Sequence, residues 1–402
     1  MWHKLQQRVE QRQAQSLLRQ RLTVASAQSC ELKVEGQGYL NFSSNDYLGL
    51  ANHPKMIEAM QHAAKDYGVG AGASHLIVGH SHHHHALEQE LADFVGAERA
   101  LLFSTGYMAN FGVLTSLLDK QDLIVQDKLN HASLIDGGLA SEAKMRRYAH
   151  NDTEALQRQL QSPLSTDTNS TFETKLVVTD GVFSMDGDIA PLQSIHQVCQ
   201  QTSAQLMVDD AHGFGVLGQQ GKGTVSHCGL PSCDIYMATL GKALGGFGAF
   251  VAGSSLLIES LIQFARSYIY TTAMPPAIAA ANRMGLKLLQ QEDWRREQLN
   301  KNIALFKQLA KQANLPLMQS DTAIQPILLK SNELVAKVSA ELKQQGILAL
   351  AIRPPTVPVN SARLRITLTA QHSEEQIVRL VEVLQKSVQV VSKQVANQTY
   401  EL

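Results

Sequence analysis

The sequence predicts an α/β protein with a mostly parallel sheet of about seven strands flanked by helices, followed by a smaller α+β domain. Short apolar runs between residues 99 and 252 alternate with helical patterns, which is typical of a parallel sheet. From about residue 290 the pattern changes to long helices separated by short strands. The chain has 402 residues, more than one compact core usually holds, so a second domain is expected.

The first elements are expected in a simple order along the chain. Residues 1–22 fit an amphipathic helix that packs on the body of the protein through Leu5 and Val9. An Arg-rich, acid-poor N-terminus is also found in organellar transit peptides, which is the alternative interpretation. Residues 40–50 predict a strand that runs into a turn, and residues 68–79, rich in Gly, Ala and Ser, predict a flexible loop. The strands of the large sheet are expected at 99–103, 122–127, 145–149, 175–179, 206–208, 236–238 and 248–252.

The C-terminal region is expected to contain a helix at 332–345 and strands at 324–329, 348–352 and 363–368. A capping-box pattern at 373–376 marks the start of a last helix. The polar segment 162–174 is expected to be an exposed loop. These elements predict three parts, which are an N-terminal helical arm at 1–40, a large cofactor-binding domain at 41–288 and a small α+β domain at 289–402.

Composition argues against several classes of function. The net charge of −1 gives no electrostatic footprint for nucleic acid, and no apolar run approaches the roughly 18 residues that a membrane span needs. The four cysteines form no CxxC pair, which fits reduced thiols in a cytoplasmic protein. The histidine-rich run His80–His85, with its unusual stretch His82–His85, can bind metal. However, consecutive histidines point in different directions on a helix and no carboxylate or cysteine cluster completes a site, so no metal is expected.

Polar side chains follow several predicted strands at their carboxyl ends, where an open parallel sheet places its ligand crevice. The candidates that follow strands in this way are Gly106, Tyr107, His131, Ser184, Asp209, His212, Thr239 and Lys242. A helix is expected to begin just after Gly106 and Tyr107. Its free N–H groups favour a phosphate, and the glycine lets the anion approach the backbone closely. We therefore expect these side chains to line one pocket.

Four of these residues together suit pyridoxal phosphate. A lysine such as Lys242 can bond covalently to the cofactor aldehyde. Asp209 can hold a proton on the pyridine nitrogen, which makes the ring a better electron sink. His212 could reach the ring hydroxyl, and Thr239 could donate to the phosphate. Taken singly, each residue has an ordinary explanation, such as a surface lysine or a helix-capping aspartate, so the prediction depends on their combination and order.

The sequence around these residues resembles the α-oxoamine synthases. The similar motifs are Asn-Phe-Ser-Ser-Asn-Asp-Tyr-Leu-Gly at 41–49, Asp-Asp-Ala-His-Gly at 209–213 and Thr-Leu-Gly-Lys at 239–242, and the resemblance covers about residues 15–390. It implies the fold of the fold-type I pyridoxal-phosphate enzymes. It also implies an acyltransferase that condenses an amino acid with an acyl thioester and releases carbon dioxide and coenzyme A.

Within that family, the segments at 148–152, 181–188, 351–358 and 362–369 are most similar to the branch that joins L-alanine to a pimeloyl thioester in biotin biosynthesis. A sister enzyme that uses glycine and a shorter acyl group, like 2-amino-3-ketobutyrate ligase, keeps the same cofactor residues and remains an alternative. A cofactor-binding regulatory module and a His-rich metal-binding protein are alternatives from other classes. Whether the acyl carrier is coenzyme A or a carrier protein stays open.

The resemblance also implies roles for single residues. The implied catalytic residues are Lys242, His131, Asp209 and His212, with His131 stacked on the cofactor ring. The implied cofactor-binding residues are Gly106, Tyr107, His131, Ser184, Asp209, His212, Thr239, Lys242, Thr271 and Thr272. The last two match a loop that reaches the phosphate of the neighbouring subunit, which implies a homodimer with shared active sites. The implied substrate-binding residues are Arg19, Asn45, His131, Thr356 and Arg365, and Arg365 and Asn45 are expected near the amino-acid carboxylate.

Overall fold

The computed structural model describes the whole chain except residues 16, 19–20, 163–171 and 401–402. The chain divides into two compact units. The larger unit is Leu50–Ser184 with Ile189–Trp294, and the smaller unit is Met1–Gly49 with Met185–Asp188 and Arg295–Leu402. The three-part division expected from the sequence stays a prediction. The exposed loop expected at 162–174 falls mostly on residues outside the described part.

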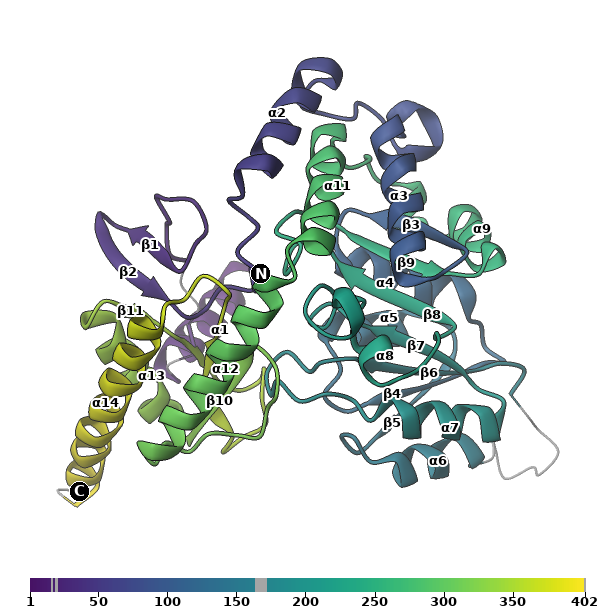
Figure 1. Cartoon of the computed structure of the whole chain (residues 1–402). Helices are drawn as coiled ribbons and strands as arrows, with labels where there is room; N and C mark the ends of the chain where they lie inside the picture. Colours follow the sequence, from purple (N-terminus) through teal and green to yellow (C-terminus); the bar gives the residue numbers. More distant parts are fainter. Residues whose placement is uncertain (16, 19–20, 163–171, 401–402) are drawn as a thin grey trace. The chain divides into compact units, whose positions relative to one another are not determined.

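The larger unit is built on a sheet of seven strands in the order β3-β9-β8-β7-β6-β4-β5 (Figure 1). The strands are β3 (Arg99–Phe103), β4 (Leu123–Asp127), β5 (Lys144–Tyr148), β6 (Lys175–Asp180), β7 (Gln205–Asp209), β8 (Ile235–Thr239) and β9 (Ala249–Gly253). Strand β9 is antiparallel to both of its neighbours, and the other pairs are parallel. The predicted mostly parallel sheet of seven strands is therefore confirmed, and each strand lies close to its expected range.

Helices surround this sheet. They are α2 (Pro54–Tyr67), α3 (His82–Val95), α4 (Gly106–Leu117), α5 (Ala132–Ala140), α6 (Thr153–Gln161), α7 (Leu192–Thr202), α8 (Thr224–His227), α9 (Ser255–Phe264), α10 (Arg266–Ile269) and α11 (Pro276–Gln291), with short turns η1 (His75–Gly79) and η2 (Gln219–Gly221). Strand residues such as Val178 and Met207 form a core with residues of α4, α5 and α9. Strands buried on both faces need nearly continuous apolar runs, which is why these runs stand out in the sequence.

The glycine-rich segment before α3 was expected to be a flexible loop, and that expectation is only partly right. Its last residues form the π-helical turn η1, in which both His75 and Gly79 are buried. A Cβ atom at Gly79 would lie 2.2 Å from the carbonyl oxygen of Ala73, so only glycine fits there. The abundance of small residues therefore reflects a tight turn at this end of the segment.

The smaller unit holds two sheets of three strands. One contains β1 (Glu31–Val34), β2 (Gln37–Asn41) and β11 (Ile347–Leu348), and the other contains β10 (Ile324–Lys330), β13 (Ala362–Thr367) and β12 (Leu350–Ile352). The single strand expected at 348–352 is thus divided between two sheets: β11 pairs with β2 in parallel, and β12 pairs with β13 in antiparallel. The helices of the unit are α1 (Trp2–Ala14), α12 (Trp294–Gln312), α13 (Asn332–Gln344) and α14 (Glu374–Tyr400).

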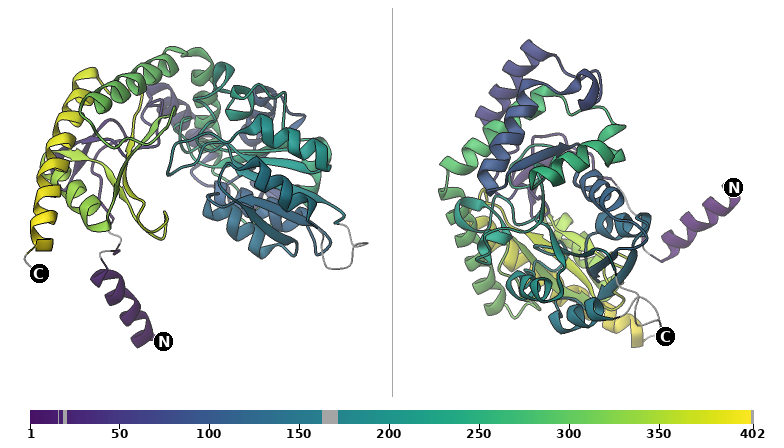
Figure 2. Two further views of the ribbon diagram at one scale, coloured as in Figure 1. Left: turned by 90° about the horizontal axis from the view of Figure 1, so that it is seen from below. Right: turned by 90° about the vertical axis from the view of Figure 1, so that its right-hand side faces the viewer.

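The C-terminal helix begins as the sequence predicts. The backbone N–H of Ser373 donates to Oε1 of Gln376 at 3.1 Å, and the N–H of Gln376 donates to Oγ of Ser373 at 3.3 Å. This reciprocal pair is a capping box, which satisfies two backbone donors at the start of a helix. Helix α14, 27 residues long, packs against α13 (Figure 2).

The expected N-terminal helix is shorter and less embedded than predicted. Helix α1 ends at Ala14, and none of its residues is buried. Leu5 and Val9 are 40% and 54% exposed, so the expectation that they pack on the body is wrong. Between them the helix carries mostly Gln and Arg, and an apolar stripe this narrow provides little hydrophobic area to bury. None of the helices in the described part of the chain combines the length and the apolar composition that crossing a bilayer requires.

Gly223 provides a test of packing in the larger unit. Its φ is +101°, and a Cβ atom there would lie 1.9 Å from Oδ2 of the buried Asp210. We expect Gly223→Ala to lower the free energy of unfolding by about 3 kcal/mol or more, because backbone strain adds to overlap with a buried carboxylate. Urea unfolding measures the effect. Gly229 also has a positive φ, of +71°, but a Cβ there would meet only Gln193 at 3.4 Å. If Gly229→Ala lowered the free energy of unfolding as much as Gly223→Ala, overlap with the Asp210 carboxylate could not be the cause.

His372 provides a test of pH dependence in the smaller unit. Burial lowers its pKa to about 4, opposed by hydrogen bonds to Asn41 and Thr369, and its ring stacks on Phe42 with centroids 4.2 Å apart. An unfolded histidine titrates near pH 6.5, so below that pH the unfolded chain binds a proton that the folded chain refuses. Stability should therefore fall as the pH drops from about 6.5 to about 4, by at most about 3 kcal/mol from this residue. Between pH 7 and 4.5, the unfolding midpoint should fall less steeply with pH in His372→Gln than in the unaltered protein. Equal slopes in the two proteins would exclude His372 as a cause of the pH dependence.

Candidate active site

The polar residues that follow the strands of the larger unit meet in one cavity of about 200 Å³. The cavity brings together Gly106, Tyr107, His131, Ser184, Asp209, His212, Thr239 and Lys242. They follow the carboxyl ends of β3, β4, β6, β7 and β8. Parallel pairing brings the last four of these ends to one edge of the sheet, and β3 runs in the same direction because β3 and β8 are both antiparallel to β9. The expectation that these side chains share one pocket is therefore fulfilled.

Lys242 lies in a rigid turn at the end of β8. Its Nζ is 2.8 Å from Nε2 of His212. The turn is anchored by buried Leu240 and Leu244 on either side of the lysine. Backbone N–H groups close it: Gly246 donates to the carbonyl of Leu240 at 2.8 Å, and Gly245 to that of Lys242 at 2.9 Å. The burial and the hydrogen bonds fix the backbone of the turn, which places the amine next to an imidazole.

Asp209 presents its carboxylate to the cavity. The side chain is 4% exposed. Nδ2 of Asn110 donates to its Oδ2 at 2.7 Å, and the backbone N–H of Ala211 donates to its Oδ1 at 3.0 Å. Donors to both oxygens fix the direction in which the carboxylate points.

Asp210 comes next in the chain but has a structural role, because successive side chains at a strand end point to opposite faces. It accepts hydrogen bonds from the N–H and hydroxyl of Thr224 and from the hydroxyl of Tyr236. Burial raises the pKa of the Asp210 carboxyl to about 7, although these hydrogen bonds oppose the shift. It does not line the cavity, so of the two adjacent aspartates Asp209 is the one placed for chemistry.

His131 caps the start of α5 and faces the same cavity. Its backbone N–H donates to Oδ2 of Asp180 at 2.8 Å, and its Nδ1 lies 2.7 Å from the hydroxyl oxygen of Ser133. Burial lowers the pKa of the imidazole and nearby Lys242 lowers it further, while Asp209 raises it. The net shift is downward, so the ring is neutral near pH 7 and can accept or donate a hydrogen bond.

The start of α4 forms the anion-binding end of the cavity. Thr105 caps the helix, its Oγ1 accepting from the N–H of Met108 at 3.2 Å. A Cβ atom at Gly106 would meet only Met237, at 3.8 Å, so packing does not demand glycine here. The space that a side chain would fill stays open in front of the helix N-terminus, which favours an anion. The hydroxyl of Tyr107 donates to Oδ2 of Asp136 at 2.7 Å.

Thr239 lines the cavity, and its predicted contact with a phosphate stays a prediction. Its hydroxyl donates to the carbonyl oxygen of Gly248 at 2.9 Å, and its Oγ1 accepts from the N–H of Gly241 at 3.3 Å. In this structure the side chain therefore braces the turn that carries Lys242. Donation to a phosphate would require the hydroxyl hydrogen to change partner.

The other candidates lie elsewhere. Thr271 and Thr272 follow α10 in the larger unit and do not line the cavity of their own chain. Asn45, Thr356 and Arg365 belong to the smaller unit. Arg19 lies outside the described residues.

Both arginines of strand β13 are buried, which excludes the alternative of surface charges. Arg363 and Arg365 are each 4% exposed. Arg363 forms an ion pair with Asp186. Arg365 donates to Oδ1 of Asn45 at 3.1 Å and to Oγ1 of Thr367 at 3.0 Å. The predicted association of Arg365 with Asn45 is thus present within the smaller unit.

Three residues with polar side chains that line the cavity were not singled out from the sequence. Asn110 bonds Asp209, Ser133 bonds His131, and Asp180 accepts from the backbone of His131. Burial and the nearby Asp209 raise the pKa of Asp180 well above its usual range. A signal was available for Asn110, which is a lone amide on the otherwise apolar buried face of α4. A buried polar group on such a face needs a partner, and here the partner is the catalytic candidate.

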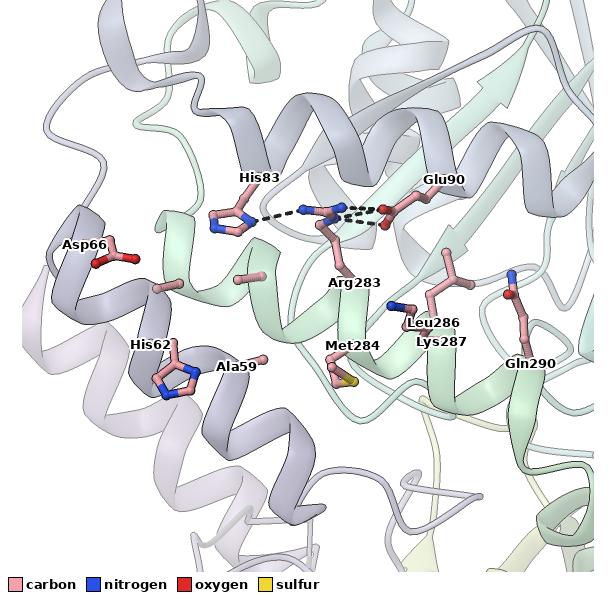
Figure 3. Close-up of a pocket in the computed structure, with 12 residues that line it drawn as sticks. Ala59, His62, Asp66, His83, Glu90, Arg283, Met284, Leu286, Lys287 and Gln290 are labelled. Carbon is pink, nitrogen blue, oxygen red and sulfur yellow. Dashed lines mark hydrogen bonds and ion pairs between the residues drawn. The ribbon is translucent and has the colours of Figure 1, made fainter.

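A separate groove of about 480 Å³ lies between α2, α3 and α11 (Figure 3). Arg283 dominates it, donating to both carboxylate oxygens of Glu90 and, at 3.2 Å, to Nδ1 of His83. The arginine and the glutamate bind each other, and the groove contains none of the residues that follow the strands of the sheet. The smaller cavity at the strand ends is the better candidate for chemistry.

Comparison with known proteins shows the family of the chain. A family model described as aminotransferase class I and II matches residues 37–384. The 8-amino-7-oxononanoate synthase of Cellvibrio japonicus (strain Ueda107) is 56% identical over 378 residues, which cover 94% of this chain and 93% of that protein.

Solved structures match over most of the chain as well. An 8-amino-7-oxononanoate synthase from Francisella tularensis is 34% identical, with a TM-score of 0.75 over 88% of this chain and 98% of that one. A serine palmitoyltransferase from S. paucimobilis, described with pyridoxal phosphate bound, is 29% identical, with a TM-score of 0.90 over 97% of this chain and 98% of that one. These matches confirm the predicted fold class. The chain belongs to the 8-amino-7-oxononanoate synthase family.

Proposed function

We propose that the protein is a pyridoxal-phosphate-dependent acyltransferase of biotin biosynthesis. It condenses L-alanine with a pimeloyl thioester and releases 8-amino-7-oxononanoate, carbon dioxide and the free thiol carrier. The observation that carries this proposal is the amine of Lys242, held 2.8 Å from His212 in a cavity that also contains Asp209. Family membership supports the choice of substrates.

The residues of the cavity fit the cofactor. The open space at Gly106, in front of the N-terminus of α4, suits a phosphate. Asp209, fixed by Asn110, suits a protonated ring nitrogen. The neutral ring of His131 suits a planar aromatic neighbour. An anion site, an acid and an amine in one cavity are the groups that this cofactor needs.

When bound, pyridoxal phosphate supplies an aldehyde that bonds amines and a ring that withdraws electron density from the carbon next to the bonded nitrogen. Lys242 is the amine placed to hold that aldehyde and, once released, to remove the α-proton of the amino acid. Nε2 of His212 lies within hydrogen-bonding distance of the lysine Nζ, at 2.8 Å, and so helps to fix the direction in which the amine points. Asp209 keeps a proton at the ring nitrogen, and neutral His131 is placed to donate to a carbonyl oxygen.

Arg365 and Asn45 are the proposed site for the amino-acid carboxylate. A guanidinium binds carboxylates well because its parallel N–H groups match the two oxygens. Arg365 is buried and oriented by Asn45 and Thr367, so little side-chain entropy would be lost on binding. Thr356 and Arg19 remain proposed contacts of the substrate.

A homodimer is proposed in which Thr271 and Thr272 complete the partner's phosphate site. Ile77 and Val78 on η1 are 74% and 80% exposed, which is unusual for adjacent apolar residues. The N–H of Ala273 donates to the carbonyl of Ala73 at 3.0 Å, so this apolar surface adjoins the loop that carries the two threonines. A second copy covering it would bury the apolar side chains. A cytoplasmic location is likewise proposed.

The test is thiol release by the cofactor-loaded protein, with L-alanine or glycine against pimeloyl-, succinyl- and acetyl-coenzyme A. Turnover restricted to alanine and pimeloyl-coenzyme A is expected. Turnover with glycine and a short acyl group would move the protein to a sister activity with the same cofactor site. If no coenzyme A ester reacts, the same assay with a pimeloyl carrier protein decides between the two acyl carriers, and failure with both would overturn the proposal.

A further inference from the structure

The histidine-rich run before α3 folds into a cluster that the proposed reaction does not use. His80 precedes the capping residue Ser81, and His85 lies in the first turn and a half of α3. Their ring centroids are 6.0 Å apart, with the rings edge to face. Glu88 lies one turn further along the same helix face, since residues three apart are neighbours on a helix. Two histidines and a carboxylate therefore converge from one short stretch of chain.

The converging atoms have the spacing of a metal site. The ligand atoms of His80, His85 and Glu88 all lie within 4.8 Å of one another, and Nε2 of His80 is 3.8 Å from Oε2 of Glu88. Zinc bonds imidazole nitrogen and carboxylate oxygen at about 2.0–2.2 Å, so its ligands lie at most about 4 Å apart. Small side-chain rotations would bring the three atoms to that spacing. No metal was expected from the sequence, in which no carboxylate cluster adjoins the histidines, but Glu88 supplies a carboxylate on the next turn of the helix.

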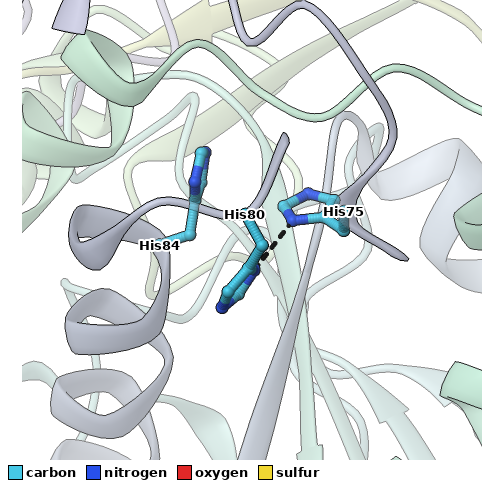
Figure 4. A group of neighbouring side chains, drawn as sticks. All are labelled: His75, His80 and His84. Atoms are coloured by element: carbon cyan, nitrogen blue, oxygen red, sulfur yellow. Dashed lines mark hydrogen bonds between the residues drawn. The ribbon is translucent and has the colours of Figure 1, made fainter. Parts of the chain in front are cut away.

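Neighbouring groups already orient two of the three ligands. Glu88 is 14% exposed, and its Oε1 accepts from the backbone N–H of Leu102 at 3.0 Å. Nδ1 of His80 lies 3.0 Å from Nδ1 of buried His75 (Figure 4). The ring of His75 stacks on Tyr268 with centroids 5.2 Å apart, which fixes its direction. Metal-binding histidines commonly use their second nitrogen in this way, so that the first points at the metal.

His84 is close to this cluster but is not a ligand. Its Nδ1 accepts from the backbone N–H of Ser81 at 2.9 Å, and its Nε2 lies 2.6 Å from the carbonyl oxygen of Met274. Both ring nitrogens are therefore engaged, and the residue closes a capping box at the start of α3. Figure 4 shows the dashed bond joining His75 and His80 and none to His84.

Charge at the cluster is mixed. Burial raises the pKa of Glu88 to about 7, while the hydrogen bond from Leu102 and the guanidinium of Arg99 oppose that shift, so a cation that binds here displaces a proton from part of the population. Arg99 also lies 3.4 Å from Glu259, which offsets part of its charge. His85 is exposed, so a metal ion could enter from solvent and keep water as a fourth ligand. An open position of this kind is typical of sites with three protein ligands.

We propose that His80, His85 and Glu88 form a binding site for a divalent transition metal such as Zn²⁺, separate from the active-site cavity. The bound ion links the loop before α3 to the first two turns of that helix. The site depends only on side-chain positions within the larger unit.

The experiment is calorimetric titration of Zn²⁺ into the cofactor-loaded, chelator-treated protein, carried out without a polyhistidine tag. We expect one Zn²⁺ per chain and a rise in melting temperature with Zn²⁺, because a ligand that binds only the folded state stabilises it. Co²⁺ should give the visible spectrum of a site with nitrogen and oxygen ligands. His85→Ala should weaken binding by at least about 100-fold. His75→Ala, which removes the orienting partner of His80 together with its stacking on Tyr268, should weaken binding by about 10- to 100-fold.

His85 is exposed, so its removal should not affect folding, and Glu88→Gln tests the carboxylate at nearly constant shape. His82→Ala is the matched control, because His82 is an exposed histidine of the same run outside the cluster. Retained binding in His82→Ala together with loss in His85→Ala and Glu88→Gln supports the site. Absence of Zn²⁺ binding by the unaltered protein overturns it. Equal losses in His82→Ala and His85→Ala would also overturn it, since they would show diffuse binding by the run.

Discussion

Replacement of Lys242 by alanine is expected to lower product formation by about 10⁴-fold or more, the upper end of the effect of a single acid–base group. The same side chain is proposed both to hold the cofactor aldehyde and to move the α-proton, so one substitution removes two roles. The neighbouring His212, 2.8 Å from Nζ, then has no amine to orient. The fold should survive, because the turn is anchored by buried Leu240 and Leu244 and closed by backbone hydrogen bonds.

Two measurements separate the roles of Lys242. Thiol release with alanine and pimeloyl-coenzyme A reports turnover, and borohydride reduction followed by peptide mass spectrometry reports the residue that bonds the cofactor. Lys120→Ala is the control, because the side chain of Lys120 is 80% exposed and pairs only with exposed Glu142 among the described ion pairs. Cofactor fixed to another lysine in the unaltered protein, or normal turnover in Lys242→Ala, would contradict the assignment.

Most of the cavity could be predicted from the sequence because its residues follow strands. Asp209 and Lys242 come directly after apolar runs, and a parallel sheet gathers the carboxyl ends of its strands at one edge. The positions of the apolar runs therefore predict which side chains lie close together, even though the sequence does not show how those side chains pack. The sheet itself was predictable for the same reason, since buried strands need continuous apolar runs.

The residues that the sequence did not reveal depend on tertiary contacts. Asn110 lies 99 positions before Asp209, and nothing in its local sequence indicates that the two bond. Thr239 is predicted to donate to a phosphate, and the sequence contains no sign that its hydroxyl donates to the carbonyl oxygen of Gly248, the residue before strand β9. The N-terminal helix has an apolar pattern, but whether Leu5 and Val9 are buried depends on a surface to receive them. Local pattern predicts elements and strand ends, whereas side-chain partners require the assembled fold.

Replacement of Asp209 by asparagine is expected to lower turnover by about 10²- to 10⁴-fold while the cofactor still binds in part. An amide has nearly the shape of the carboxylate, and its oxygen can still accept from the N–H of Ala211. It carries no negative charge, however, so it cannot hold a proton on the pyridine nitrogen. The loss should therefore appear in the catalytic rate, measured under saturating substrate, and less in the amount of bound cofactor.

The adjacent residue makes this a sharp comparison, because Asp210→Asn makes the same chemical change one position further along the chain. Burial raises the pKa of Asp210 to about 7, so a large part of its population is already neutral near that pH. The amide can keep all three bonds if the Thr224 hydroxyl, which now donates to Oδ1, rotates to accept from the new NH₂. Turnover in Asp210→Asn should therefore stay close to that of the unaltered protein. If Asp209→Asn and Asp210→Asn lost turnover equally, the negative charge of each aspartate would matter for folding alone. The assignment of Asp209 to the ring nitrogen would then fail.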